Sequence, residues 1–318
     1  MISVVMATFN SSKYIVQQLN SIIQNNDQID EMIIVDDCSN DNTVPIIQNI
    51  ISKYHLDKWR VYENKSNLGY RKTFRKAISK THGDIIVLCD HDDIWIKNKI
   101  SIIRNAFKEN DNILYLATKY IQIDGNGDLV KVKLKKNRAN NNLIKHSVTP
   151  HDLVKLNFKD IAVYNIAPGC TCAFSRKILP DFLTFQDKIL PHDWALATIA
   201  AVKQGLYYLD IPTTKYRIYD GNTIGLVHQS IYRKRLTLCQ KNLTEKKEML
   251  LLAKELDASK KDIEYLQRVV DLFDIRYKNL SDRNILFDII LVFQSYGVST
   301  LYESILMDIV SILKIKGK

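Results

Sequence analysis

The chain has 318 residues, of which 46% are hydrophobic and 25% are charged. These proportions exclude a disordered chain, and the length allows one large domain or one domain with a helical appendage. The net charge of +10 predicts a polyanionic partner such as nucleic acid, anionic lipid or a phosphorylated substrate. Because no nucleic-acid-binding motif accompanies the charge, nucleic acid is not expected to be that partner.

The cysteines and the apolar segments bear on location. The five cysteines lack the spacing of a disulfide framework or a zinc site, which predicts free thiols in a reducing compartment. No signal peptide is visible, and the most apolar late segment, residues 285–293, is too short to span a bilayer. We therefore expect a cytoplasmic location, and peripheral contact with the inner face of the plasma membrane is a further hypothesis.

The first 110 residues alternate between apolar runs and helical patterns. The runs predict strands at residues 3–9, 32–35, 60–63 and 84–89, with helices between them. This alternation predicts an α/β fold with a mostly parallel sheet, in which ligands bind at the carboxyl ends of the strands. Polar residues follow each strand, at positions 8–10, 36–37, 67–69 and 90–93. They are expected to meet at one edge of the sheet.

Beyond residue 110 the pattern changes. A longer strand at residues 113–123 precedes a strong turn signal at 124–128, which predicts a hairpin. Further along we expect a basic loop at residues 131–145 and a loop entering a strand at 168–174. A helix is expected at 192–205, followed by two short strands at 207–211 and 213–217. Helical periodicity then continues from residue 230, so a boundary is expected between residues 220 and 230.

Three carboxylates follow the strand predicted at residues 84–89. Asp90, Asp92 and Asp93 repel one another and resist loss of water, so their cluster calls for a cation or several donors. Carboxylate oxygens suit Mg²⁺ or Mn²⁺. The alternative is a solvated turn before the helix expected at 97–110, in which Asp93 serves the helix dipole.

Four segments together resemble the family-2 glycosyltransferases, which have the nucleotide-diphospho-sugar transferase fold called GT-A. They are Val-Val-Met-Ala-Thr-Phe-Asn at 4–10, Val-Asp-Asp-Cys-Ser-Asn-Asp-Asn-Thr at 35–43, Asn-Leu-Gly at 67–69 and Cys-Asp-His-Asp-Asp-Ile-Trp at 89–95. The resemblance implies a Rossmann-like catalytic domain over residues 1–225 and a helical C-terminal region over 226–318.

A further segment is similar to bacterial polysaccharide rhamnosyltransferases. Tyr216 and Arg217, followed by Asn222 and Gly225, match a Tyr-Arg-x-His-Gly-x-Asn-x-x-Gly pattern, although Tyr219 and Asp220 stand at its His and Gly positions.

The resemblance assigns a nucleotide-binding set. Asp37 would accept a hydrogen bond from N3–H of uracil or thymine, and Asp36 would orient that loop. The whole set is Ala7, Thr8, Asn10, Asp36, Asp37, Asn67, Gly69, Lys72, Asp90 and His91. The residues also permit an Asx-turn at Asp36 and Asp37, a plain turn around Gly69 and a His91 without a ligand.

The resemblance also assigns the reacting groups. Asp92 would be the direct ligand of Mn²⁺ or Mg²⁺, and Asp90 would contact the ribose and metal-bound water. Asp193, in a His-Asp-Trp segment, would be the catalytic base at its ordinary pKa, although a helix-dipole role fits it too. Donor and acceptor sugars would meet Gly169, Cys170, Thr171, His192 and Trp194, and Arg217 would bind the diphosphate. Each of these assignments has a structural alternative. Residues 169–171 could form an ordinary turn entering a strand, and His192 could cap a helix. Trp194 could lie in the core, and Arg217 could form a surface salt bridge.

These assignments predict a metal-dependent, inverting glycosyltransferase of the hexosyltransferase type. It would move a sugar from a UDP- or dTDP-sugar to a glycan or lipid-linked acceptor, in the synthesis of cell-surface polysaccharide or of glycoprotein glycans. The competing hypotheses are a sugar nucleotidyltransferase and a non-catalytic nucleotide-sugar-binding module with a partner-binding tail.

The helical region carries a leucine stripe among basic residues. Leu236, Leu243, Leu250 and Leu251 form it, and we expect it to pack on the catalytic domain or on a second protomer in a homodimer. A sharper hypothesis places part of this region on an anionic membrane, beside a lipid-linked acceptor.

Overall fold

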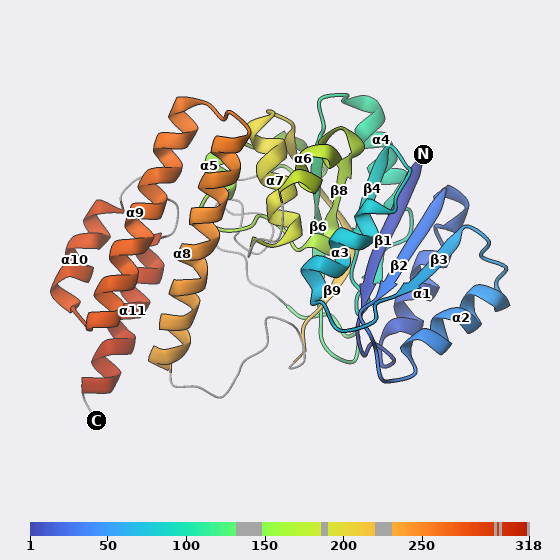
Figure 1. Cartoon of the computed structure of the whole chain (residues 1–318), viewed down its shortest axis with the longest axis horizontal. Helices are drawn as coiled ribbons and strands as arrows, with labels where there is room; N and C mark the ends of the chain where they lie inside the picture. Colours follow the sequence, from blue (N-terminus) through green and yellow to red (C-terminus); the bar gives the residue numbers. More distant parts are fainter. Residues whose placement is uncertain (132–147, 186–189, 220–230, 296–297, 299–300, 317–318) are drawn as a thin grey trace.

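The computed structural model describes residues 1–131, 148–185, 190–219, 231–295, 298 and 301–316. A mixed sheet with helices on its faces forms one end of the molecule, and a bundle of long helices forms the other (Figure 1). The sheet runs in the order β3-β2-β1-β4-β8-β6-β9-β5, with β7 paired to β9.

The four strands predicted in the first part of the chain are confirmed. They are β1 (Ile2–Thr8), β2 (Glu31–Asp36), β3 (Trp59–Glu63) and β4 (Ile85–Cys89), all parallel. The connecting helices are α1 (Ile15–Ile23), α2 (Thr43–Lys53) and α3 (Tyr70–Ser79). The apolar runs form strands because both faces of this half-sheet are covered by helices.

The second half of the sheet is mixed. β8 (Cys172–Ser175) is antiparallel to β4 and to β6 (Tyr115–Ile123), and β6 runs parallel to β9 (Leu206–Arg217). β5 (Ile94–Trp95) and β7 (Leu153–Lys155) pair antiparallel with β9.

Two local predictions need correction in this half. The two short strands expected at 207–211 and 213–217 are one strand, because β9 follows β6 through two register shifts. The hairpin expected at 124–128 is reduced to a turn and one bridge, between Ile123 and Leu129. The basic loop expected at 131–145 falls almost wholly outside the described residues.

The register of the parallel strands aligns their carboxyl ends. Thr8 lies opposite Asp36, and Met6 lies opposite Cys89, the last residue of β4. The polar residues that follow β1, β2 and β4 therefore leave the sheet at one edge, as the alternation predicted.

Two layers cover the sheet. One core lies under α1, α2 and α4 (Lys99–Glu109), and a larger one lies under α3 and α7 (His192–Val202). The short helices α5 (Phe158–Ile161) and α6 (Leu179–Thr184) contribute to the larger core. Residues 192–201 of α7 are all buried, so this helix is central to the fold.

The helical region comprises α8 (Ile231–Glu255), α9 (Lys260–Asp282), α10 (Ile285–Gln294) and α11 (Leu301–Lys316). Leu243 and Leu250 of α8 are buried in the larger core with residues of α7, so their expected packing on the catalytic domain is confirmed. Leu251 is 42% exposed. The division expected between residues 225 and 226 lies outside the described residues and stays a prediction. No described helix is both long and apolar enough to cross a membrane.

A buried ion-pair group fastens α11 to the rest of the bundle. Asp308 is fully buried and accepts hydrogen bonds from Arg235 Nε of α8 at 2.5 Å and Arg276 Nε of α9 at 2.6 Å. The carboxylate of Asp308 therefore joins three helices. Its removal would leave the guanidinium groups of Arg235 and Arg276 without their anionic partner.

We expect Asp308→Ala to lower the free energy of unfolding by about 3–5 kcal/mol, because it leaves buried guanidinium groups uncompensated. Chemical denaturation followed by circular dichroism measures this. Asp274→Ala is the matched control, since Asp274 pairs with Lys247 and Lys278 near the surface and should cost about 0–1 kcal/mol. Equal losses for the two variants would contradict the role given to Asp308.

Candidate active site

Two carboxylates and a thiol meet just beyond β4. An oxygen of Asp90, an oxygen of Asp93 and Cys170 Sγ all lie within 4.8 Å of one another. Asp93 Oδ1 accepts a hydrogen bond from Arg217 N at 2.8 Å, whereas its buried Oδ2 has no partner among the described residues. The helix-dipole role considered for Asp93 is wrong, because α4 begins only at Lys99 and has no acid in its first turn.

Burial and crowding shift the acids of this cluster toward their neutral forms. Loss of water, followed by repulsion from Asp93 and Asp92, holds the pKa of Asp90 well above its usual range. Burial first, and then the Asp92 charge, raises the pKa of Asp93 to about 7. A cation among these oxygens would reverse both effects, so the cluster is chemically suited to hold one.

Asp92 lies next to this cluster but has a different partner. Its Oδ2 accepts a hydrogen bond from Tyr219 Oη at 2.9 Å. Tyr219 is one of the two residues that depart from the rhamnosyltransferase pattern, and sequence reasoning gave it no role. The assignment of Asp92 as the direct metal ligand stays a prediction.

Arg217 is a structural centre of this edge. It is 1% exposed, and its guanidinium donates to the carbonyl oxygens of Asp92, Asp124 and Gly125 and to Gln17 Oε1. The surface salt bridge considered for it is therefore wrong. Its predicted contact with a diphosphate would require these hydrogen bonds to be exchanged.

The residues after β1 and β2 are tied together. Asp36 Oδ1 accepts from Thr8 Oγ1 at 2.7 Å and from Ser39 Oγ at 2.6 Å, and Asn10 Oδ1 accepts from Asn40 N at 3.0 Å. Asn10 has a φ of 46°, a left-handed conformation that asparagine tolerates. These contacts fix the two loops that are predicted to bind the nucleoside.

Asp37 and His91 also have partners within the chain. Asp37 accepts hydrogen bonds from Asn64 Nδ2 at 2.7 Å and from the backbone N–H groups of Leu68 and Gly69, each at 2.8 Å. It thus holds the turn before α3, where Gly69 has a φ of 80°. Asn67 Oδ1 also accepts from Gly69 N. His91 Nδ1 lies 3.2 Å from the carbonyl oxygen of Ala7. Base recognition by these residues stays a prediction.

Asp193 is a buried carboxylate with few donors. It is 8% exposed at the start of α7, where its Oδ2 accepts from Asn165 Nδ2 at 2.8 Å and its Oδ1 accepts from Trp194 N at 2.9 Å. Burial raises the pKa of Asp193 to about 6 in spite of these hydrogen bonds. The expectation of an ordinary pKa is therefore wrong, because the sequence did not reveal how completely the surrounding segments cover this group.

The turn at Gly169–Thr171 brings Asp193 close to the acid cluster. A β-carbon at Gly169 would lie 3.3 Å from the β-carbon of Asp193, so glycine permits this approach. The side chains of Cys170 and Thr171 are buried, and Lys99 Nζ donates to the carbonyl oxygen of Cys170 at 2.6 Å. Sequence reasoning missed Asn165 and Lys99, since neither belongs to a motif.

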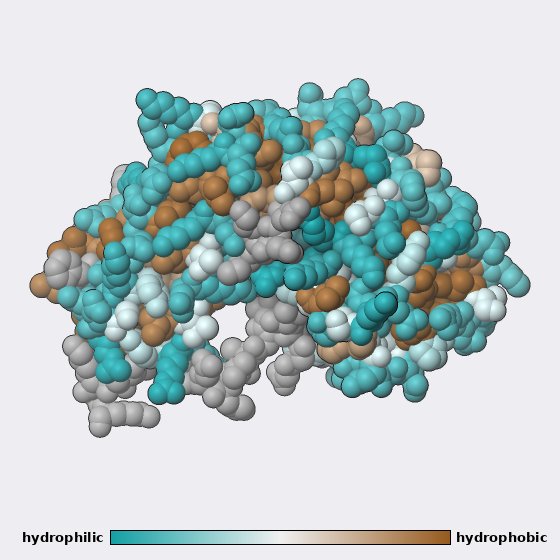
Figure 2. Space-filling model, viewed as in Figure 1, coloured by the Kyte–Doolittle hydropathy of each residue, from teal (hydrophilic) through white to brown (hydrophobic). Residues whose placement is uncertain are grey.

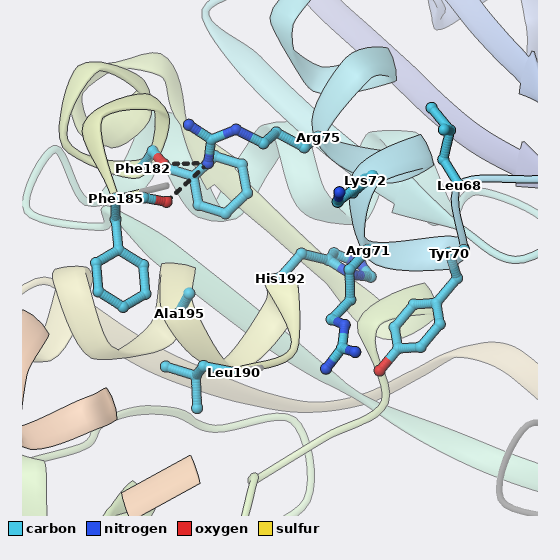
Figure 3. A pocket seen from close by; sticks show the side chains of 11 residues that line it. Leu68, Tyr70, Arg71, Lys72, Arg75, Phe182, Phe185, Leu190, His192 and Ala195 are labelled. Atoms are coloured by element: carbon cyan, nitrogen blue, oxygen red, sulfur yellow. Dashed lines mark hydrogen bonds between the residues drawn. The ribbon is translucent and has the colours of Figure 1, made fainter. Parts of the chain in front are cut away.

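His192 lies beside a pocket of about 230 Å³ between α3 and the α6–α7 segment. Figure 3 shows Arg71, Lys72 and Tyr70 on one side of this pocket, with Phe185 and Leu190 opposite. The ring of His192 stacks on Phe74 with centroids 4.1 Å apart, and burial lowers the pKa of His192 to about 3. Neither ring nitrogen of this neutral histidine has a partner among the described residues.

Trp194 has the core position rather than a platform for sugars. It is 5% exposed, and its Nε1 donates to the carbonyl oxygen of Ile161 at 2.9 Å. Lys246 Nζ of α8 lies 3.8 Å from the centroid of its ring. The helical region therefore packs directly against α7, and the buried Trp194 does not offer its ring to a sugar as expected.

Electrostatic coupling places the principal groups around one space. The charge of Asp193 contributes to the raised pKa of Asp90, and both carboxylates contribute to the raised pKa of Tyr70, after burial. Asp90, Asp193 and Tyr70 are therefore near enough to influence one another, and Tyr70 also lines the pocket beside His192.

A half-parallel sheet with an acidic cluster beyond β4 and a buried carboxylate facing it defines a nucleotide-diphospho-sugar transferase of the GT-A class. The family model described as glycosyl transferase family 2 matches residues 3–182, more than half of the chain. The chain belongs to this family and is a glycosyltransferase.

Individual relatives agree with this assignment. The chain is 29% identical over 267 residues to RfbG, a dTDP-rhamnosyl transferase of Shigella flexneri. The match covers 73% of this chain and 82% of RfbG. It is 33% identical over 103 residues to TuaG of Bacillus subtilis, a putative teichuronic acid biosynthesis glycosyltransferase, covering 31% and 39% of the two chains.

Solved structures share the fold. Residues 1–349 of S. aureus TarS in complex with UDP-GlcNAc match with a TM-score of 0.59 at 17% identity, over 99% of this chain and 90% of that one. The mannosyltransferase PcManGT of Pyrobaculum calidifontis, in complex with GDP-Man and Mn²⁺, matches with a TM-score of 0.59 at 14% identity, over 98% and 86%.

We expect Asp193→Asn to lower the turnover number by about 10²–10⁴-fold, the usual contribution of a general base. In the wild type, the rate should fall as the pH drops below about 6, because the base is then protonated. A pH profile of sugar transfer measures this, and a rate independent of pH in this range would contradict it.

The same substitution should not lower the melting temperature at neutral pH. Because the folded-state pKa of Asp193 is raised from 3.8 to about 6, stability is lost as the pH rises through this interval, and asparagine avoids that loss. Asp111→Asn, at an exposed position, is the control for both measurements.

Proposed function

We propose that this glycosyltransferase moves a sugar from a UDP- or dTDP-sugar to a glycan or lipid-linked acceptor with inversion of configuration. The observation that carries the proposal is the buried carboxylate of Asp193, which lies on a different element from the acid cluster but near it, because Gly169 packs against Asp193 while the neighbouring Cys170 belongs to the cluster. Inversion in one displacement needs one base on the face opposite the leaving group. The names of RfbG and TuaG support a role in the synthesis of cell-surface polysaccharide.

The buried carboxylate supplies the base. With a pKa of about 6, Asp193 is mostly ionised at neutral pH, yet it retains more basicity than an exposed aspartate. Asn165 and Trp194 N each hold one of its oxygens, which fixes the carboxylate toward the acceptor hydroxyl.

The cluster at the end of β4 supplies a cation site. Asp90 and Asp93, with Asp92 beside them, would hold Mn²⁺ or Mg²⁺, and the unpartnered Oδ2 of Asp93 fits this assignment. When bound, the cation would stabilise negative charge on the departing diphosphate. The Mn²⁺ in the PcManGT complex supports a divalent ion.

The pocket beside His192 supplies an acceptor or donor subsite. Arg71 and Lys72 bring positive charge to one wall, and the neutral imidazole of His192 lies beside the pocket with both ring nitrogens buried. Phe185 and Leu190 make the opposite wall apolar. A ligand with an anionic or hydroxyl-bearing group and an apolar part matches these walls.

We further propose that the protein works in the cytoplasm. All five cysteines are free in the structure, and three of them lie in the core of the sheet at Cys89, Cys170 and Cys172. Free thiols fit a reducing compartment.

UDP and dTDP are expected to raise the melting temperature, while CDP is not. A carboxylate at Asp37 suits the N3–H of uracil or thymine and rejects the N3 acceptor of cytosine. At about 100-fold over Kd the stabilisation is about 2.7 kcal/mol, on the order of 5 °C here. A thermal-shift panel measures this; stabilisation by CDP equal to that by UDP would overturn the base assignment.

The affinity for Mn²⁺ in the presence of UDP should rise with pH through about 7. Protonated Asp90 and Asp93 must lose their protons before the cation binds, since their pKa values are raised. Electron paramagnetic resonance of free Mn²⁺ measures the affinity at each pH. Asp90→Asn should weaken binding and Asp111→Asn should not; an affinity unchanged by Asp90→Asn would rule out the site.

A further inference from the structure

The two C-terminal helices present an apolar face to solvent. On α10 the exposed face consists of Leu286, Ile289, Ile290 and Phe293, and on α11 it consists of Leu306, Met307, Val310 and Leu313. Phe293 is 77% exposed and Leu286 is 67% exposed. We call these eight residues the α10–α11 face.

The spacing shows that this face is organised. Residues 286, 289, 290 and 293 follow the i, i+3, i+4, i+7 pattern of one helical stripe, and 306, 310 and 313 repeat it on the packed neighbour. Of the described side chains on α10 and α11 that are exposed, Gln294 alone is polar, and none is charged. Contiguous patches of this kind mark interaction sites.

The two acids of these helices whose side chains the structure describes point inward. Asp288 and Asp308 are both fully buried, so the α10–α11 face carries no negative charge from them. Of the four leucines in the stripe proposed from sequence on α8, Leu243 and Leu250 are buried against the catalytic domain, Leu236 is half-buried and Leu251 is 42% exposed. The exposed apolar side chains of α10 and α11 lie at the end of the molecule away from the sheet, where hydrophobic residues reach the surface (Figures 1 and 2).

Positive charge brackets this face. Arg283 is exposed just before α10, and Arg268 is exposed at its other end, where its Nη2 donates to the carbonyl oxygen of Gln294 at 3.2 Å. An apolar stripe flanked by cations matches the interface of an anionic bilayer, which offers acyl chains beside negative headgroups.

A second copy of this chain fits less well. Suppose that α10 paired with α10 of a second copy about a two-fold axis. Because an arginine lies at each end of the helix, arginines of the two copies would meet whether the helices ran parallel or antiparallel. Like charges placed together disfavour such a contact.

We propose that the α10–α11 face docks this protein on an anionic lipid surface. The docked bundle would hold the catalytic domain beside the membrane. The benefit of that placement rests on the proposed function, because a lipid-linked acceptor would be presented there.

The test is co-sedimentation of the full chain with two kinds of vesicle, one of phosphatidylcholine alone and one of phosphatidylcholine with an equal amount of phosphatidylglycerol. We expect binding to the anionic vesicles and weakening by salt. Leu286→Gln with Phe293→Gln should weaken binding by about tenfold or more, because both side chains are exposed in the free protein and buried on docking. Arg268→Gln and Arg283→Gln should each weaken binding to anionic vesicles by roughly fivefold.

A matched pair of substitutions controls for hydrophobicity alone. Leu129 and Leu238 are 68% and 52% exposed on other elements, and Leu129→Gln with Leu238→Gln should leave vesicle binding unchanged. Equal binding by the Leu286/Phe293 variant and the wild type would overturn the proposal. So would a dimer in analytical ultracentrifugation that Phe293→Gln dissociates, since that would make a second copy the occupant.

Thermal shift with UDP separates this proposal from the proposed function. UDP stabilisation without vesicle binding would overturn the docking face and leave the glycosyltransferase site intact. Vesicle binding without any nucleotide stabilisation would support the face and count against the donor assignment.

Discussion

The structure depends on the burial of carboxylates at the carboxyl edge of a parallel sheet. Asp90 and Asp93 follow a fully buried strand, and Asp193 approaches them from α7. Buried carboxylates are tolerated here because the chain supplies fixed hydrogen-bond donors. The backbone N–H of Arg217 donates to Asp93, and Asn165 donates to Asp193. Lys99 adds a buried cation that fixes the carbonyl oxygen of Cys170 and so holds the turn between them. The site is thus a set of carboxyl groups that the fold compensates only in part, which raises their pKa values.

The helical region forms a structural support for this arrangement. Lys246 of α8 is fully buried with no hydrogen-bond partner among the described residues, and its Nζ lies over the ring of Trp194. Burial lowers the pKa of Lys246 to about 7, so the ammonium form that makes this cation–π contact is partly populated at neutral pH. Because Trp194 N also holds Asp193, the contact links α8 to the position of the proposed catalytic carboxylate. The same bundle that carries the apolar face therefore packs against α7, the helix that carries Asp193.

Sequence patterns predicted the parallel half of the fold because local periodicity and strand-end chemistry agree there. Each apolar run before Thr8, Asp36 and Asp90 forms a strand, and the register brings those residues together. The pattern failed for Trp194 and Arg217, whose burial depends on α8 and on the turn after β6, both distant in sequence. The pKa of Asp193 was missed for the same reason, since desolvation is a property of the assembled core. Asn165 and Tyr219 were missed because single polar residues outside a motif give no local signal.

Water is excluded from the whole site, and the resulting low local dielectric constant determines how the site would respond to substrate. Burial raises the pKa values of Asp90, Asp93 and Asp193, and burial also lowers the pKa of His192 to about 3 and that of Lys246 to about 7. Acids and bases alike are moved toward neutrality, as expected where water is excluded. A diphosphate and its cation would therefore bring most of the charge into the site. Because electrostatic interactions are stronger in such an environment than in water, small changes in the position of Asp90 or Asp193 would have large effects on the reaction.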